Sequence, residues 1–216
     1  MMHMLALVLC VLAVLVILLL SEIGWRRGYM GNEVGRKFVH VLVGSFVAFW
    51  PFFLSWDTIR LLSIGFVVVV LISRQFNIFK VIHSVQRPTY GGIYFALIVG
   101  VLTFITQRKG IYTAGLLQMS VADGMAAVIG VEYGIKRNIG PRYKIFGHTK
   151  TVLGTCTFFV FSLAILVSYG ADATRLGWGL AAALAAGATV LENIAVAGLD
   201  NLAVPLLVTA GLIWVG

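Results

Sequence analysis

Residues 5–20 read LALVLCVLAVLVILLL, an unbroken apolar run without a charged side chain. A helix needs about 20 mostly apolar residues to cross the hydrocarbon core of a bilayer, and this run approaches that length. No Lys or Arg precedes the run, and no small-residue cleavage pattern follows it. We therefore expect a first membrane helix that is retained, rather than a signal peptide that is removed.

Further apolar runs recur along the whole chain. The eight candidate spans are 4–21, 38–54, 59–73, 92–106, 112–131, 152–169, 176–191 and 202–215. The third, fourth and last are short, so one of them could be re-entrant or buried against its neighbours, which leaves seven spans as an alternative. Of the residues, 60% are hydrophobic and 11% charged, too few polar groups to cover a soluble domain. We predict an all-α, polytopic transmembrane helical bundle of 7–8 spans, forming a single integral membrane domain over residues 1–216.

The basic residues are distributed unevenly between the loops. The first, third and fifth loops carry twelve Lys or Arg residues, whereas the other loops and the termini carry four. The positive-inside rule therefore places the odd-numbered loops in the cytoplasm; the seventh loop has neither Lys nor Arg, and its side follows from the span count. Topology and anionic lipid headgroups account for most of the net charge of +8, so we expect membrane lipids as partners and no nucleic acid.

Asp123 lies deep in the fifth apolar run, within VADGMAAVIG at residues 121–130. An ionisable group inside a span is costly and is therefore a functional candidate. Small neighbours such as Gly124 allow another backbone or a ligand to approach closely. The functional interpretation is a carboxylate ligand for Mg²⁺, which prefers oxygen donors. The alternative is a structural Asp paired with a neighbouring helix.

Two further loops on the predicted cytoplasmic side carry candidate binding groups. In KIFGHTKTVLGT, at residues 144–155, Lys150 and Thr151 stand where a span begins, close to Gly154. A helix N-terminus with a Lys and hydroxyl groups can bind an anion, although the spacing is not that of a Walker A loop. The alternative is a topology-setting loop with a Thr cap.

The seventh loop is acidic, with Glu192, Asp200 and Asn201 in an otherwise apolar stretch. On the same face as Asp123 and Lys150, these acids need a cation, which the divalent metal of a nucleotide or a basic side chain would supply. A plain helix cap by Asp200 or Asn201 is the alternative.

The first and third loops add basic groups. Helical spacing puts Lys37 and His40 on one face with Glu33, and Arg36 lies alongside. Arg87 precedes a Gly-Gly break and could meet a phosphate; a flexible turn is the alternative. Carboxylates for a metal and cations for phosphates at one membrane face suit phosphoryl transfer, which needs mainly positioning and charge neutralisation.

Five segments resemble the CTP-dependent polyprenol kinase family, which includes dolichol kinase, phytol kinase and CTP-dependent diacylglycerol kinase. They are E-x-x-R-K-x-x-H at 33–40, Y-G-G-I-Y-F at 90–95, A-D-G-x-A-A-x-I-G at 122–130, K-T-x-x-G-T at 150–155, and an acid at 192 followed by G-L-D-N-L-A-V-P at 198–205. The small size is similar to that of the compact, phytol-kinase-like members. One departure concerns the acid that the family often has two residues before the Gly of K-T-x-x-G, where this chain has Val152.

The resemblance implies transfer of the γ-phosphoryl group of CTP to phytol, geranylgeraniol or another polyprenol, with Mg²⁺ and with residues 22–216 as the catalytic bundle. Asp123 and Asp200 would then hold the metal, and His40 or Glu192 would take the hydroxyl proton. The implied nucleotide-binding residues are Arg36, Lys37, Arg87, Gly124, Lys150, Thr151, Gly154 and Asn201. The site would face the cytoplasm. The alternatives are an enzyme similar to phosphatidate cytidylyltransferase, a membrane transporter, and a scaffold without catalytic activity.

Overall fold

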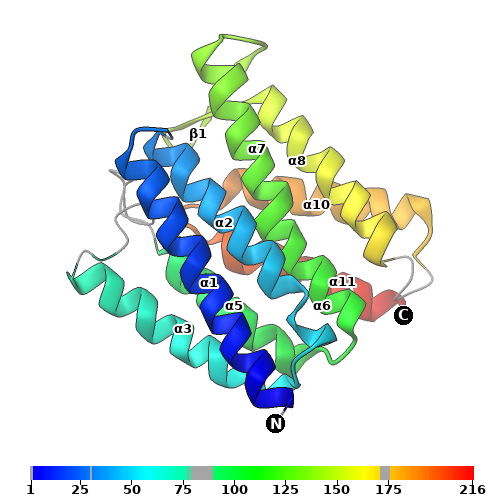
Figure 1. Cartoon of the computed structure of the whole chain (residues 1–216). Helices are drawn as coiled ribbons and strands as arrows, with labels where there is room; N and C mark the ends of the chain where they lie inside the picture. The colour runs from blue at the N-terminus through cyan, green and yellow to red at the C-terminus, as the bar shows by residue number, and fades with distance from the viewer. Residues whose placement is uncertain (1, 30, 77, 79–89, 171–175) are drawn as a thin grey trace.

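The computed structural model describes residues 2–29, 31–76, 78, 90–170 and 176–216 (Figure 1). In these residues the chain is built from eight helical rods. Their elements are α1 (Met2–Arg26), α2 (Asn32–Ala48), α3 (Trp56–Phe76), α5 (Gly91–Ile105), α6 (Lys109–Leu117) continuing through η2 (Gln118–Ala122), α7 (Asp123–Ile129) and η3 (Gly130–Lys136), α8 (Val152–Ile165) with η4 (Leu166–Gly170), α10 (Trp178–Ile194) and α11 (Asp200–Val215). The segments η2, η3 and η4 are π-helical.

The prediction of an all-α membrane bundle is confirmed. Each candidate span overlaps one rod, and four rods are long and apolar enough to cross a bilayer: Met4–Arg26, Trp56–Phe76, Lys109–Lys136 and Val152–Tyr169. Gly91–Ile105, Trp178–Ile194 and Asp200–Val215 are shorter apolar helices.

The second predicted span is displaced. It was expected at 38–54, whereas α2 runs from Asn32 to Ala48 and is followed by a 3₁₀ turn, η1 (Trp50–Phe52). A prediction from hydropathy leaves the first turns of α2 out of the span because they carry charged residues, although these turns are helical. The helix ends before Pro51, which lacks the N–H that an α-helix would need there.

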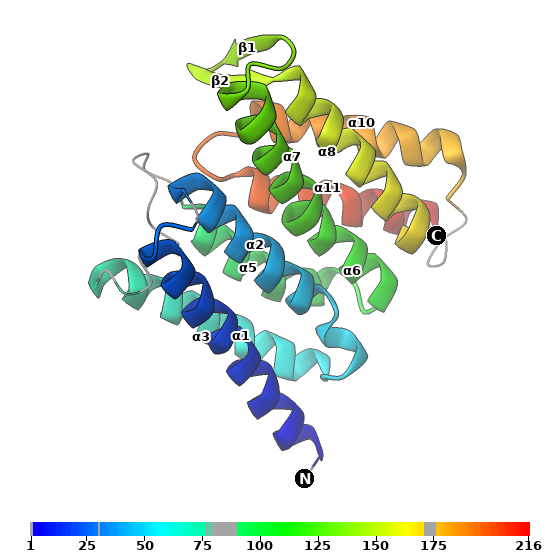
Figure 2. The same cartoon turned by 45° about the horizontal axis from the view of Figure 1, so that its top comes forward.

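The rod from α6 to η3 is the centre of the bundle. In its apolar window 67% of the residues are buried, against 17% in α1, so α1 is a peripheral helix that packs on α2. The central rod contacts α2 and α8, and its α6 end contacts α11. In Figures 1 and 2, α7 runs between α2 and α8, with α10 and α11 behind.

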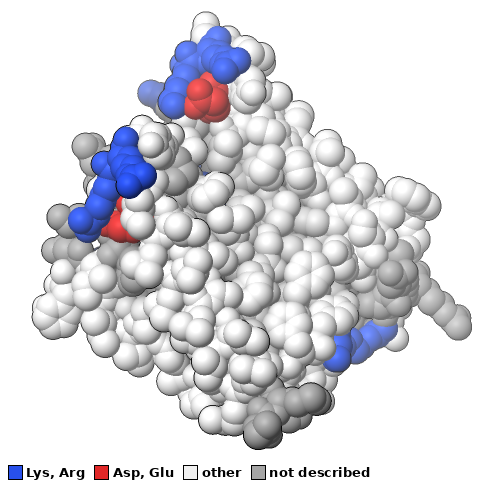
Figure 3. Space-filling model, in the orientation of Figure 1, with Lys and Arg blue, Asp and Glu red and all other residues white. Residues whose placement is uncertain are grey.

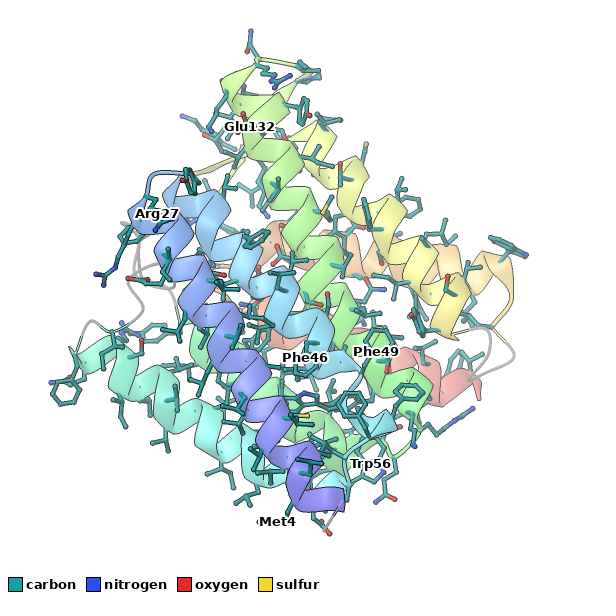
Figure 4. All side chains as sticks on the ribbon, in the orientation of Figure 1. Met4, Arg27, Phe46, Phe49, Trp56 and Glu132 are labelled. Atoms are coloured by element: carbon teal, nitrogen blue, oxygen red, sulfur yellow. The ribbon has the colours of Figure 1, made fainter. Side chains whose placement is uncertain are left out.

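Charged side chains gather at one end of the bundle. Figure 3 shows basic and acidic groups at this end, a further basic group at the opposite end, and a wide uncharged surface between them. Figure 4 labels Arg27 and Glu132 at the charged end, and Met4 and Trp56 at the other. This distribution is that of an integral membrane protein, in which the uncharged zone faces lipid.

A β-hairpin at the charged end replaces the loop expected before the sixth span (Figure 2). Strand β1 (Arg142–Ile145) pairs antiparallel with β2 (His148–Thr151), and Tyr143 stands opposite Lys150. Phe146 and Gly147 form the turn with φ values of 47° and 78°. Two consecutive positive φ angles are typical of the tight turns that suit the twist of a hairpin.

Candidate active site

A cavity of about 480 Å³ opens between α2, α7, η3, the hairpin and the turn between α10 and α11. The charged and amide side chains that line it come from five separate parts of the sequence. They are Arg36, Lys37, Asp123, Lys150, Glu192, Asp200 and Asn201. The structure thus brings most of the candidate residues into one space.

Asp123 is paired across the bundle with α2. Lys37 Nζ lies 2.5 Å from Asp123 Oδ2, and His40 Nε2 lies 3.7 Å from the same oxygen. The side chains of Lys37 and Asp123 are only 7% and 6% exposed. The three-residue spacing puts Lys37 and His40 on one face of α2, as the sequence predicted, and the structure shows that this face meets α7. Asp123 directly follows the π-helical segment η2, and π-helical turns occur frequently at functional sites.

The hairpin carries Lys150 to the end of α10. Its Nζ lies 2.5 Å from Glu192 Oε1 and donates to the backbone carbonyl of Glu192 at 2.9 Å. Lys150 therefore enters the cavity from the end of an extended strand, directly before the N-cap residue of α8. Its ammonium group is held at two points by a single residue of α10.

The start of α8 is capped by its own sequence. Thr151 is the N-cap residue, and its Oγ1 accepts a hydrogen bond from the Gly154 amide at 3.0 Å. The Gly154 amide is therefore not free to bind an anion. For this amide, the structure shows the Thr cap that was the alternative to an anion site. Gly154 also lies against the central rod, where a Cβ atom would come within 3.1 Å of the Ala126 carbonyl oxygen. Thr151 and Gly154 both line the cavity.

Asp200 is the first residue of α11, and no side chain caps this helix. The cap alternative for Asp200 and Asn201 is therefore wrong. Among the residues that the structure describes, the Asp200 carboxylate has neither a hydrogen bond nor an ion pair. The charge of Asp123 acts on it unfavourably, whereas Lys37 and Lys150 partly compensate. An acid in this position lacks a cation of its own.

Asn201 is anchored on one side only. Its Nδ2 donates to the Gly91 carbonyl at 3.0 Å, whereas its Oδ1 has no partner among the described residues although Asn201 is only 3% exposed. Tyr90, next to Gly91, donates its amide to the Ala197 carbonyl at 3.0 Å. The Gly-Gly segment of the sequence motif thus holds the turn before α11, and its Gly91 carbonyl is occupied by Asn201.

Two of the candidates that the structure describes, Gly124 and His40, do not line the cavity. Gly124 packs against α2, where a Cβ atom would lie 2.2 Å from Val41 Cγ2, so its lack of a side chain permits helix contact. His40 donates from Nε2 to the Met119 carbonyl at 2.9 Å and lies behind Asp123. Arg87 lies outside the described residues. Glu33 belongs to α2, but its side chain is not among those described.

The donor set fits a magnesium ion that arrives with a polyphosphate. The described residues contain no group of three or more His, Cys, Asp or Glu that would enclose a metal by themselves. Mg²⁺ is usually bound by one or two carboxylates together with substrate phosphates. The unpaired Asp200 carboxylate and the unpartnered Asn201 Oδ1 are oxygen donors of this kind beside Asp123.

Other cavity residues were not singled out from the sequence. Ala126, Ala127 and Val131 form an apolar wall on α7 and η3, and Thr155 lines the side formed by α8. Thr155 is the last residue of the K-T-x-x-G-T motif, and this motif is the sequence feature that could have identified it as a cavity residue. The alanines resemble ordinary packing residues in sequence, so nothing distinguished them.

Comparisons with known proteins bear on this site. No family model matches the chain, and no solved structure matches it. The phytol kinase of Synechocystis sp. is 31% identical over 198 residues, which cover 88% of this chain and 82% of that protein. The chain therefore belongs to the phytol-kinase-like polyprenol kinase family and is, at the level of that family, a lipid alcohol kinase.

Proposed function

We propose that the protein transfers the γ-phosphoryl group of CTP to an isoprenoid alcohol, such as phytol, geranylgeraniol or another polyprenol, at the cytoplasmic face of a membrane. One observation carries the proposal: Asp123, Lys150 and Asp200, which are far apart in sequence, share one cavity at the charged end of the bundle. The use of CTP and the isoprenoid acceptor are supported by the family relationship.

The charges of the cavity divide into two sets. Asp123 and Asp200 are the proposed metal ligands, with Asn201 Oδ1 beside them. When bound, Mg²⁺ supplies the positive charge that neutralises phosphate oxygens during transfer. Lys37 from α2 and Lys150 from β2 line the same cavity and stabilise the remaining negative charge of the triphosphate. Arg36 lines the same cavity and adds a third cation.

Glu192 is the better candidate for the proton acceptor. Its carboxylate lines the cavity, whereas His40 lies outside it and its Nε2 already donates to a backbone carbonyl. In the proposed step the alcohol oxygen attacks the γ-phosphorus, and the bond to the β–γ bridging oxygen breaks. CDP leaves with that electron pair, and the hydroxyl proton passes to Glu192. Before this step, Lys150 exchanges its contact with Glu192 for a phosphate, which frees the carboxylate to accept the proton.

The apolar wall of the cavity suits a lipid acceptor. Ala126, Ala127 and Val131 project from the rod that crosses the membrane, directly beside the charged groups. A prenyl chain can lie along these small side chains while its hydroxyl group reaches Glu192.

The test is a phosphorylation panel with purified protein and Mg²⁺. Each nucleoside triphosphate, labelled in the γ-phosphate, is combined with phytol, geranylgeraniol, dolichol or diacylglycerol. We expect the label to enter the isoprenoid lipid with CTP as the preferred donor, and Asp123→Asn to abolish it. Asp57→Asn is the matched control, because Asp57 is 88% exposed and directly follows Trp56, which Figure 4 labels at the opposite end of the bundle.

Two results would contradict the proposal. Pyrophosphate and a CDP-lipid formed from phosphatidic acid would indicate a cytidylyltransferase instead. Solute flux into proteoliposomes without nucleotide turnover would indicate a transporter.

A further inference from the structure

The hairpin is docked on α10 by a pair of neighbouring contacts. Tyr143 and Lys150 are cross-strand partners, and they contact two consecutive residues of α10. Lys150 binds Glu192, whereas the Tyr143 hydroxyl donates to Asn193 Oδ1 at 2.5 Å. One contact is an exchangeable ion pair inside the cavity, and the other is a hydrogen bond between neutral groups.

The second contact belongs to a satisfied polar network. Asn193 is 9% exposed, and its Oδ1 also accepts from Thr155 Oγ1 at 3.2 Å. Its Nδ2 donates to the Thr189 carbonyl at 2.8 Å, which fixes the amide orientation on α10. The hydroxyl groups of Tyr143 and Thr155 also contact each other, so their two protons are shared among three contacts. Buried polar networks whose members are all satisfied are rigid and specify one geometry.

We propose that Tyr143 and Asn193 are positioning residues that hold Lys150 in place for the nucleotide phosphates. This inference rests on the proposed function, in which Lys150 binds the triphosphate. Neither residue lines the cavity, so both act through the strand that carries Lys150.

The small hairpin needs a contact of this kind with α10, and we call the Tyr143–Asn193 hydrogen bond its tether. A two-stranded hairpin is marginally stable by itself in water. Arg142 ties its beginning to η3, with Nη2 2.8 Å from the Ile135 carbonyl, but this contact lies away from α10. When Lys150 leaves Glu192 for a phosphate, the Tyr143–Asn193 hydrogen bond still holds β1 beside α10, and strand pairing then holds β2 there.

Tyr143→Phe tests this directly, because it removes only the hydroxyl group. We expect the KM for the nucleotide to rise about tenfold, since one hydrogen-bond donor of the network is lost. The KM for the alcohol should stay within about twofold, because the apolar wall is on the central rod. Amide hydrogen exchange in residues 142–151 should become faster, because the hairpin loses its attachment to α10.

Tyr133→Phe is the matched control. Tyr133 is 40% exposed, its hydroxyl group has no partner among the described residues, and its ring contact with Arg137 is retained by Phe. Asn193→Leu should reproduce the effect of Tyr143→Phe. The double variant should be no worse than the more severe single variant, because both changes break the same contact.

The inference is overturned if Tyr143→Phe behaves like Tyr133→Phe in both nucleotide KM and hydrogen exchange. It is also overturned if hairpin exchange accelerates while the nucleotide KM is unchanged, since the tether then does not serve Lys150. A wild-type protein that transfers no phosphate would refute the proposed function and the kinetic half of this inference. The exchange comparison would still decide whether Tyr143 holds the hairpin.

Discussion

Replacing Lys37 with Met would remove the closest cation from Asp123 while keeping a side chain of similar length. The ammonium and carboxylate groups are 2.5 Å apart, and both side chains are less than a tenth exposed. His40 Nε2 lies 3.7 Å from this carboxylate, but its proton is directed to a backbone carbonyl, and Arg36 acts on the carboxylate more weakly than Lys37 does. Lys37→Met would therefore leave a buried carboxylate without adequate compensation.

The expected loss of stability is about 3–5 kcal/mol, the usual cost of removing one partner of a buried ion pair. With about 2–4 °C for each kcal/mol in a chain of this size, the midpoint of thermal unfolding should fall by ~10 °C. The double variant Lys37→Met/Asp123→Asn should recover most of this loss, because the uncompensated charge is then gone.

The measurement is thermal unfolding in detergent, followed by the fluorescence of the five tryptophans. Lys136→Met is the matched control: Lys136 pairs with Glu132 at 2.7 Å, but their side chains are 55% and 36% exposed. Solvent screens such a pair, so its loss should not move the midpoint measurably. Equal midpoints for Lys37→Met, Lys136→Met and the wild type would refute the reasoning.

Three further predictions concern single positions. Asp200→Asn should abolish phosphoryl transfer yet leave the unfolding midpoint unchanged or higher, because the carboxylate has no cationic partner in the described residues; a clear drop in the midpoint would contradict this. Gly124→Ala should destabilise by about 1–3 kcal/mol through its contact with Val41, whereas Gly65→Ala, with open space around the new Cβ, should be neutral or slightly stabilising in the same unfolding assay. Thr151→Val should cost about 0.5–2 kcal/mol, because α8 loses its cap; an unchanged midpoint would show that the cap contributes nothing.

Much of the architecture could be predicted because hydropathy is a local property. A run such as 5–20 can satisfy its backbone in lipid only as a helix, whatever the rest of the chain does. The same argument identified Asp123 as exceptional, since a carboxylate in such a run needs a partner or a function. The helical period also put Lys37 and His40 on one face before any contact was known.

The pairing of charges could not be read in this way. Asp123 and Lys37 are 86 positions apart, and the basic residues near the cavity are equally plausible partners in sequence. Which of them meets Asp123 depends on how α2 lies against α7, and small contacts such as that between Gly124 and Val41 decide this approach. The hairpin that carries Lys150 to Glu192 likewise depends on a two-residue turn with positive φ at Phe146, where the sequence shows no strong turn signal.

The sequence by itself determined a helical membrane protein with costly polar groups near one face, because each apolar run and each buried charge carries its own energetic demand. Only the tertiary structure decided that Lys37 and Lys150 are already paired with acids, whereas Asp200 has no partner in the described part of the chain. The physical reason is that ion pairing is a relation between distant elements. Helix packing decides which charges pair, and neither the charge pattern nor the periodicity along the chain contains that information.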